Sequence, residues 1–143
     1  EMQRFLYKEN FYYYFNIPEE TKNYRIPQMI LHTFIENIFK HVMDINSFVT
    51  IFMRCSFESH NSQEMLKIEI HNSGKCFEEE ILRKINEDRE ESEGGGIGLS
   101  HIKKILAILY GQEHLLLLEN EEPEGSKVTV WIPREVQNEV IDS

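Results

Sequence analysis

The sequence predicts an α+β protein, a two-layer α/β sandwich in which helices cover one face of a mixed, mostly antiparallel sheet. Three observations predict it: two apolar segments with helical spacing, two adjacent segments that alternate apolar and polar residues, and a closing pair of strand-like segments. With 143 residues, 41% of them hydrophobic, the chain is long enough to form one domain with its own core.

Composition sets the expected boundaries and partners. We expect residues 1–10 to be the end of an upstream helix or a linker, residues 11–134 to form the folded domain, and residues 135–143 to be an acidic flexible tail. The net charge of -10 disfavours nucleic acid and anionic membranes as partners, since both attract basic surfaces. Cys55 and Cys76 have no metal-ligand spacing, so we predict neither a metal cluster nor a disulfide scaffold.

The first half of the domain contains a strand, a long helix and a hairpin. Residues 11–17 are rich in aromatic side chains and predict a strand. Residues 26–44 have apolar side chains at helical spacing, with Pro27 in the first turn. Residues 48–72 alternate with a period of two around the turn SHNSQ, which predicts an antiparallel hairpin with one buried face.

The second half returns to helices before the last two strands. Residues 77–87 predict a short charged helix, and residues 88–96 are a polar, glycine-ended stretch that we expect to be mobile. Segments 114–120 and 126–133 predict two strands joined by the turn EEPEG. The helix predicted at 99–110 has one apolar stripe, made by Leu99, Ile102, Ile105, Leu106 and Leu109.

A polar stripe interrupts the long helix. Helical spacing places Thr33, Asn37, Lys40, His41 and Asp44 on one face. One interpretation is a solvated edge. The other is a pocket wall, in which an amide oxygen ligates a hard cation such as magnesium and an ammonium group neutralises phosphate charge.

Asn72 ends the second strand of the hairpin with the same parity as Leu66, Ile68 and Ile70, so it should point toward the helices. A polar amide there needs a partner, which the edge of a purine base could supply. Alternatively, the side chain closes an Asx turn on its own backbone. Gly74 permits either outcome.

The run EGGGIGL, residues 93–99, leads directly into a helix. Bare amides at a helix N-terminus bind phosphate well, although a flexible loop would have the same composition. Lys103 and Lys104 either add positive potential or lie on an exposed helix face.

The series of motifs resembles the ATP-binding catalytic domain of sensor histidine kinases, specifically the LytS/YesM-like kinases of the GHKL superfamily, which also holds DNA gyrase, heat-shock chaperones and MutL. IPQMILHTFIENIFKHV is similar to their N box, EGGGIGLSHIKKILAILYG to their second glycine box, and GSKVTVWIP to their closing strand. The resemblance covers roughly residues 5 to 133. It implies the Bergerat-type version of the sandwich.

The resemblance also implies roles for individual residues. Asn37 would hold Mg²⁺, Lys40 and His41 would contact the phosphates, and Glu36 would be a base or a supporting group beside Lys40 in catalysis. Thr33 stands where the hydrolysing relatives have a glutamate, which favours phosphoryl transfer over hydrolysis. The remaining residues implied to bind ATP are Asn72, Gly74, Gly94, Gly96, Gly98, Leu99 and Thr129.

Two positions depart from the family pattern. The family turn reads Asp, Asn, Gly, any residue, Gly, whereas this chain has NSGKC, with Asn72 replacing the aspartate and Cys76 the second glycine. A neutral amide can still accept a hydrogen bond from adenine, at a loss of about 1 kcal/mol relative to a charged acceptor. On this basis Asn72→Asp should tighten adenine binding. Val42 also replaces a common glycine.

The resemblance implies a protein-histidine kinase of a two-component system, a cytoplasmic domain that presents the γ-phosphate of ATP to a histidine outside these residues. The expected partners are the histidine-bearing dimerisation domain of the same protein and a response regulator, in a homodimer that can carry a membrane anchor. One alternative is a degenerate module that acts by binding a protein partner, which NSGKC favours. Another is an anti-sigma-type serine kinase.

Overall fold

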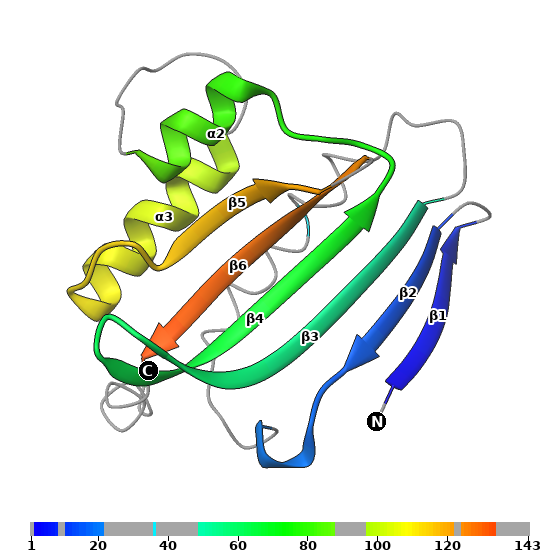
Figure 1. The fold of residues 1–143 in the computed structure, drawn as a ribbon, viewed down its shortest axis with the longest axis horizontal. Helices are drawn as coiled ribbons and strands as arrows, with labels where there is room; N and C mark the ends of the chain where they lie inside the picture. The colour runs from blue at the N-terminus through cyan, green and yellow to red at the C-terminus, as the bar shows by residue number, and fades with distance from the viewer. Residues whose placement is uncertain are drawn as a thin grey trace.

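A computed structural model describes the backbone of residues 2–8, 11–21, 36, 49–87, 97–121 and 124–133, and the side chains of 16–20, 36, 50–87, 99–121 and 124–133. Six strands form one sheet in the order β1-β2-β3-β4-β6-β5 (Figure 1). Four of the five strand pairings are antiparallel and β2–β3 is parallel, which confirms the mixed, mostly antiparallel sheet. The elements are β1 (Met2–Lys8), β2 (Phe11–Asn16), η1 (Glu19–Thr21), β3 (Val49–His60), β4 (Gln63–Ser73), α2 (Glu79–Asn86), α3 (Ile97–Tyr110), β5 (Leu116–Asn120) and β6 (Gly125–Pro133).

The first strand corrects the prediction for the start of the chain. Residues 1–10 were expected to end a helix or form a linker, but Met2–Lys8 pairs antiparallel with β2, with Met2 opposite Asn16. Phe5, Leu6 and Tyr7 include aromatic side chains that favour extended backbone. Pairing also satisfies backbone groups that a short isolated helical turn would leave open. The helix prediction is therefore wrong, and the sheet begins at Met2.

A parallel pair requires a long crossover connection, and residues 17–48 provide it between β2 and β3. Within this segment the structure describes η1 and Glu36, which is helical and exposed. The rest of the helix predicted at 26–44 lies outside the described residues, as do the stretch 88–96 and the tail 134–143.

The predicted hairpin is confirmed. β3 and β4 pair from Ile51–Asn72 to His60–Gln63 around a two-residue turn. Asn61 and Ser62 both have positive φ, 51° and 67°, which is the backbone of the hairpin turns whose twist matches that of the strands. The helix-facing side of the sheet, called here the inner face, is covered by apolar rows that include Ile51, Met53, Cys55, Leu66, Ile68, Ile70, Leu116, Leu118, Val128, Val130 and Ile132.

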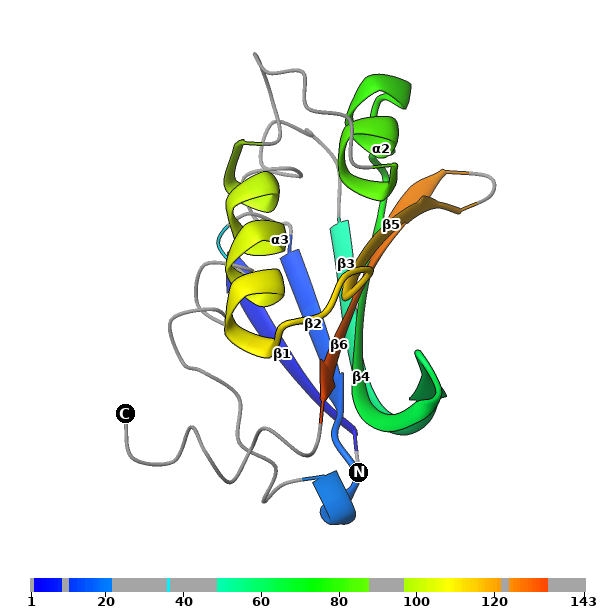
Figure 2. The ribbon, with the colours of Figure 1, turned by 90° about the vertical axis from the view of Figure 1, so that its left-hand side faces the viewer.

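Helix α3 stands against this inner face (Figure 2). Leu99, Ile102 and Leu106 are buried as predicted. Leu109 was also expected in the stripe, but it is 37% exposed, whereas Tyr110 is buried at 6%. Leu109 lies on the flank of a stripe that runs from Leu99 through Leu106 to Tyr110, so the last turn buries its neighbour instead.

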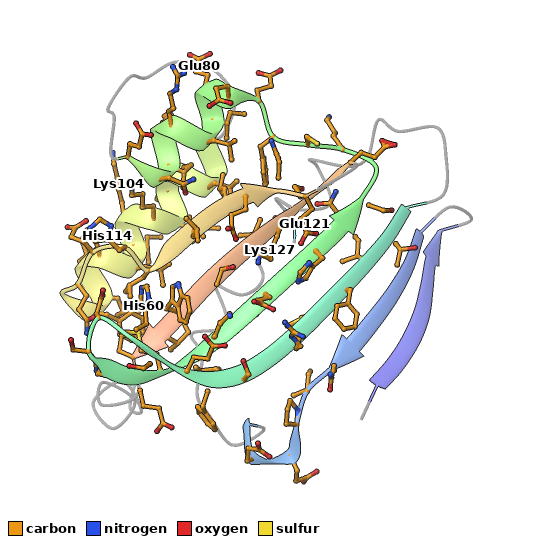
Figure 3. The ribbon with its side chains drawn as sticks, in the orientation of Figure 1. His60, Glu80, Lys104, His114, Glu121 and Lys127 are labelled. Atoms are coloured by element: carbon orange, nitrogen blue, oxygen red, sulfur yellow. The ribbon has the colours of Figure 1, made fainter. Side chains whose placement is uncertain are left out.

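The far end of the hairpin is fastened to the loop that follows α3. The ring of His60 stacks on Trp131, with centroids 4.0 Å apart and planes 2° from parallel. His60 Nε2 lies 2.7 Å from the carbonyl oxygen of His114 (Figure 3). Asn61 Nδ2 donates to the carbonyl oxygen of Glu113 at 3.2 Å. These contacts define the end of the molecule opposite the candidate site described below.

The opposite side of the sheet, called here the outer face, carries a charge network around the buried Glu69. Arg54 Nη2 lies 2.6 Å and Lys67 Nζ 2.9 Å from its carboxylate oxygens. His71 lies between the carboxylates of Glu69 and Glu121, at 3.6 and 3.1 Å. Burial raises the pKa of Glu69, but hydrogen bonds from Lys67 and Arg54 outweigh burial and lower the pKa to about 2.

This depressed pKa predicts an acid-sensitive contribution to stability. The pKa is lower in the folded chain than its ordinary value of 4.5, so the contribution is complete above that value and is lost as pH falls toward about 2. Between about pH 6 and about pH 2 it amounts to at most about 3 kcal/mol, reduced by solvent at Arg54. Urea unfolding should show that Glu69→Gln lacks this part of the pH dependence.

Glu119→Gln is the matched control, because Glu119 forms an exposed ion pair with Lys127 at 3.2 Å. It should leave the pH dependence of the wild type nearly unchanged. An identical pH dependence in Glu69→Gln and wild type would show that the network around Glu69 does not stabilise the fold.

Candidate functional site

The inner face becomes polar at the end where β4 stops and β6 begins. Strand register places Asn72, Ser126 and Asn120 in one row across β4, β6 and β5. The next row, at Ile70, Val128 and Leu118, is fully apolar. The polar row therefore closes the core at the end of the sheet at which α3 also begins (Figures 1 and 2).

Asn72 is 3% exposed, and both ends of its amide make hydrogen bonds. Its Oδ1 accepts a hydrogen bond from Ser126 Oγ at 2.6 Å. Its Nδ2 donates to the carbonyl oxygens of Ser73 and Lys75, at 3.2 Å each. The prediction that Asn72 points inward is confirmed. The alternative that it closes its own turn holds as well, because Nδ2 bonds to the turn carbonyls while Oδ1 bonds to Ser126.

Two glycines make this arrangement possible. Gly74 follows the strand with φ of 94°, a conformation that residues with a Cβ rarely adopt. Gly125 opens β6 with φ of 131°, and a Cβ added there would lie 2.5 Å from the carbonyl oxygen of Asn72. Only glycine lets β6 approach β4 this closely.

Side-chain amides also hold the segments around the polar row. Asn120 accepts from the backbone N–H of Phe77 at 2.7 Å and donates to its carbonyl oxygen at 3.0 Å. Asn86, at the end of α2, makes the same pair of bonds with Leu118, at 2.9 and 2.8 Å. Each side-chain amide bonds to both the N–H and the C=O of one residue, as a neighbouring strand would. These bonds connect the turn after β4 and the end of α2 to β5. The Cys76 thiol donates to the carbonyl oxygen of Gly125 at 3.3 Å.

The start of α3 includes residues 97–99 of the predicted glycine box. Gly98 is in the first turn of the helix and Leu99 is buried at 5% in the core. Lys103 donates to the carbonyl oxygen of Ile85 at the end of α2, so it fastens two helices together. Lys104 lies on the exposed face of α3 (Figure 3).

Comparison with known proteins identifies the family. A family model for histidine kinase-, DNA gyrase B- and HSP90-like ATPases matches residues 23–136. The chain belongs to this family. Sensor protein LytS of Bacillus anthracis is 30% identical over 126 residues, which cover 86% of this chain and 20% of LytS. Sensor histidine kinase YesM of Bacillus subtilis is 24% identical over 140 residues, which cover 98% of this chain and 22% of YesM.

The chain thus spans about a fifth of the length of these relatives. The nucleotide-free catalytic domain of histidine kinase ThkA has a similar fold, with a TM-score of 0.62 at 20% identity, covering 87% of this chain and 78% of that domain. The resemblance to LytS/YesM-like ATP-binding domains and the two-layer sandwich are both confirmed. Membership of this ATPase family implies ATP as the ligand of the domain.

The structure describes some of the residues implied to bind ATP and separates Thr129 from Asn72. Asn72 and Leu99 are buried on the inner side, and Gly74 lies in the turn after β4. Thr129 does not join them: it pairs with Glu69 and is buried on the outer face, since it is three residues from Ser126 and strand side chains alternate. Asn37, Lys40, His41, Gly94 and Gly96 lie outside the described residues.

Sequence reasoning missed Ser126 and Asn120. Both share the face of Asn72, and the available signal was their parity with the apolar residues of the closing strands.

In the described part of the chain, no helix is long and apolar enough to cross a membrane. Nor do the described residues contain a group of three or more His, Cys, Asp or Glu side chains that could hold a metal ion.

The contact at Gly125 yields a stability prediction. Gly125→Ala should lower the free energy of unfolding by about 3 kcal/mol, because it combines a strained backbone with a clash against Asn72. Gly111 also has positive φ, 64°, but open space around it, so Gly111→Ala should cost only about 1 kcal/mol. Urea unfolding of both variants measures the difference, and equal losses would mean that the close approach of β6 is not required.

Proposed function

We propose that this chain is the ATP-binding catalytic domain of a two-component sensor histidine kinase, which presents the γ-phosphate of ATP to a histidine on another segment. The observation that supports it most is the polar row at Asn72 and Ser126 on the inner face, in a member of the ATPase family. LytS and YesM, both sensor proteins by name, extend well beyond the part that this chain matches.

The site has a base end and a phosphate end. Asn72 supplies the base end, with an amide oxygen that can accept a hydrogen bond from adenine. The run that includes Gly94, Gly96 and Gly98 supplies the phosphate end, because amides that precede a helix, together with its dipole, attract anions. Gly98 already lies in the first turn of α3.

The polar stripe predicted within residues 26–44 would complete the phosphate end. Asn37 would hold Mg²⁺ through its amide oxygen, a hard ligand suited to that ion. Lys40 and His41 would contact the phosphate oxygens, and Glu36 is the candidate base or supporting group. Such a site works by positioning and charge neutralisation, which together lower the barrier to phosphoryl transfer. When bound, the magnesium ion supplies further charge neutralisation.

The partners follow from this function. The acceptor is a histidine of the dimerisation domain of the same protein, the next recipient is a response regulator, and the complete protein is a homodimer. Its catalytic domain faces the cytoplasm, with a membrane anchor elsewhere in the protein as an option. All six histidines of this chain fall within the proposed ATP-binding domain, so none of them is proposed as the acceptor.

A second candidate function is a degenerate module that binds a protein partner without turnover. The turn NSGKC favours it, because the amide that replaces the family aspartate is used to close that turn. A serine kinase of the anti-sigma type would share the nucleotide site. Acid-labile phosphate on a histidine of the full-length protein would distinguish the histidine kinase from both.

Magnesium-dependent binding of a fluorescent ATP analogue tests the proposed function. Wild type should bind, and Asn37→Ala should bind at least about tenfold more weakly, because Mg²⁺ would lose the amide oxygen proposed to hold it. Asn61→Ala is the matched control, since Asn61 contacts Gln112 and Glu113 at the far end of the molecule. Failure of wild type to bind at millimolar nucleotide would leave the partner-binding module as the function.

A further inference from the structure

A hydrogen bond on the outer face crosses β6 close to the candidate site. The ring of His71 extends from β4, and its Nδ1 lies 3.1 Å from both carboxylate oxygens of Glu121, the residue after β5 (Figure 3). Carboxylate oxygens only accept hydrogen bonds, so Nδ1 carries the proton and donates. Because β6 lies between β4 and β5 in the sheet, this bond connects two strands that are not neighbours.

Glu121 also fixes the connection that leads into β6. Its backbone N–H donates to the carbonyl oxygen of Gly125 at 3.0 Å. The same residue thus closes the connection through its backbone and attaches it to β4 through its side chain. Gly125 and Ser126 are the first residues of β6. The bond between His71 and Glu121, called here the outer clamp, therefore acts on the part of β6 that contacts Asn72.

The ring of His71 is held on its other sides as well. It contacts the ring of Phe52 on β3, with centroids 6.0 Å apart and planes at 59°. Its Nε2 lies 3.6 Å from the buried carboxylate of Glu69. His71 precedes Asn72 along β4, and the two side chains point to opposite faces of the sheet. The ring is thus a fixed point on the outer face, one residue from the site on the inner face.

We propose that His71 and Glu121 are positioning residues for nucleotide binding: the outer clamp holds the start of β6 where Ser126 meets Asn72. The inference rests on the proposed function and adds two residues that do not face the ligand. β6 begins at Gly125, opposite the last residue of β4, and strand ends open more easily than strand centres. An added contact at this point therefore restricts the movement of Ser126.

Calorimetric titration of the chain with ATP in the presence of Mg²⁺ tests the inference. Glu121→Ala should bind ATP about threefold more weakly than wild type, the size of effect expected from the loss of one partly exposed charged contact. Glu121→Gln keeps an oxygen that accepts from His71, so it should bind nearly as tightly as wild type. Affinities of Glu121→Ala and wild type within about 1.5-fold would overturn the inference.

Glu119→Ala is the matched control for charge. Glu119 lies two residues before Glu121 and forms an exposed ion pair with Lys127 at 3.2 Å. Both substitutions remove one negative charge, which by itself favours an anionic ligand. Glu119→Ala should therefore bind ATP at least as tightly as wild type. Equal losses in Glu119→Ala and Glu121→Ala would mean that the outer clamp has no specific role, and would overturn the inference.

Amide hydrogen exchange of the nucleotide-free chain gives a readout that does not depend on binding. In His71→Ala, the backbone N–H of Glu121 should exchange at least about threefold faster than in wild type, because the connection to β6 loses its attachment to β4. The N–H of Trp131, which bonds to Leu115 at the other end of β6, should exchange as in wild type. Unchanged exchange at Glu121, or equal acceleration at Trp131, would overturn the inference.

The two levels of the proposal fail in different ways. If wild type binds no ATP, the proposed function fails and this inference fails with it. If wild type binds ATP and Glu121→Ala binds it equally well, only the inference is overturned.

Discussion

The close approach of β6 to the end of β4 is the constraint on which the rest of the site depends. A side-chain carbon at residue 125 would lie 2.5 Å from the carbonyl oxygen of Asn72, so the pairing at this point requires glycine. That pairing sets Ser126 opposite Asn72, and the hydroxyl of Ser126 takes up one lone pair of the amide. The chemical character of the site thus follows from a backbone contact as much as from the residue at position 72.

Strand β4 contributes both to the stability of the fold and to the site, because its side chains alternate between the inner and the outer face of the sheet. Ile68, Ile70 and Asn72 face the helices, first as core and then as the polar end of that core. Lys67, Glu69 and His71 face outward, where Lys67 and Glu69 form an ion pair and the ring of His71 lies beside the carboxylate of Glu69. A shift of one residue in the register of this strand would exchange the two sets, so the buried ion network and the apolar rows both favour the register that places Asn72 at the site.

Local patterns carried enough information for the hairpin, for α3 and for the inward direction of Asn72, because each depends on spacing within one segment. The partner of Asn72 could not be derived in the same way. Ser126 meets it through pairing between strands, at a separation of 54 residues along the chain. The alternation within each strand predicts which face a side chain takes, but not which residue of the other strand lies opposite. Thr129 was predicted to bind ATP, but it is three residues from Ser126 along β6, so its side chain lies on the outer face. The choice between Leu109 and Tyr110 likewise depends on what packs against the last turn of α3.

The most direct measurement is a titration of the isotope-labelled chain with a non-hydrolysable ATP analogue, followed by nuclear magnetic resonance. If the base is read where β4 meets β6 on the inner face, the side-chain amide signals of Asn72 and the backbone amide of Ser126 should show the largest shifts. Signals of Glu69 and Thr129, whose side chains face the other way, should change little. Saturable binding that shifts the outer-face signals and leaves Asn72 and Ser126 unchanged would contradict the assignment of the base site.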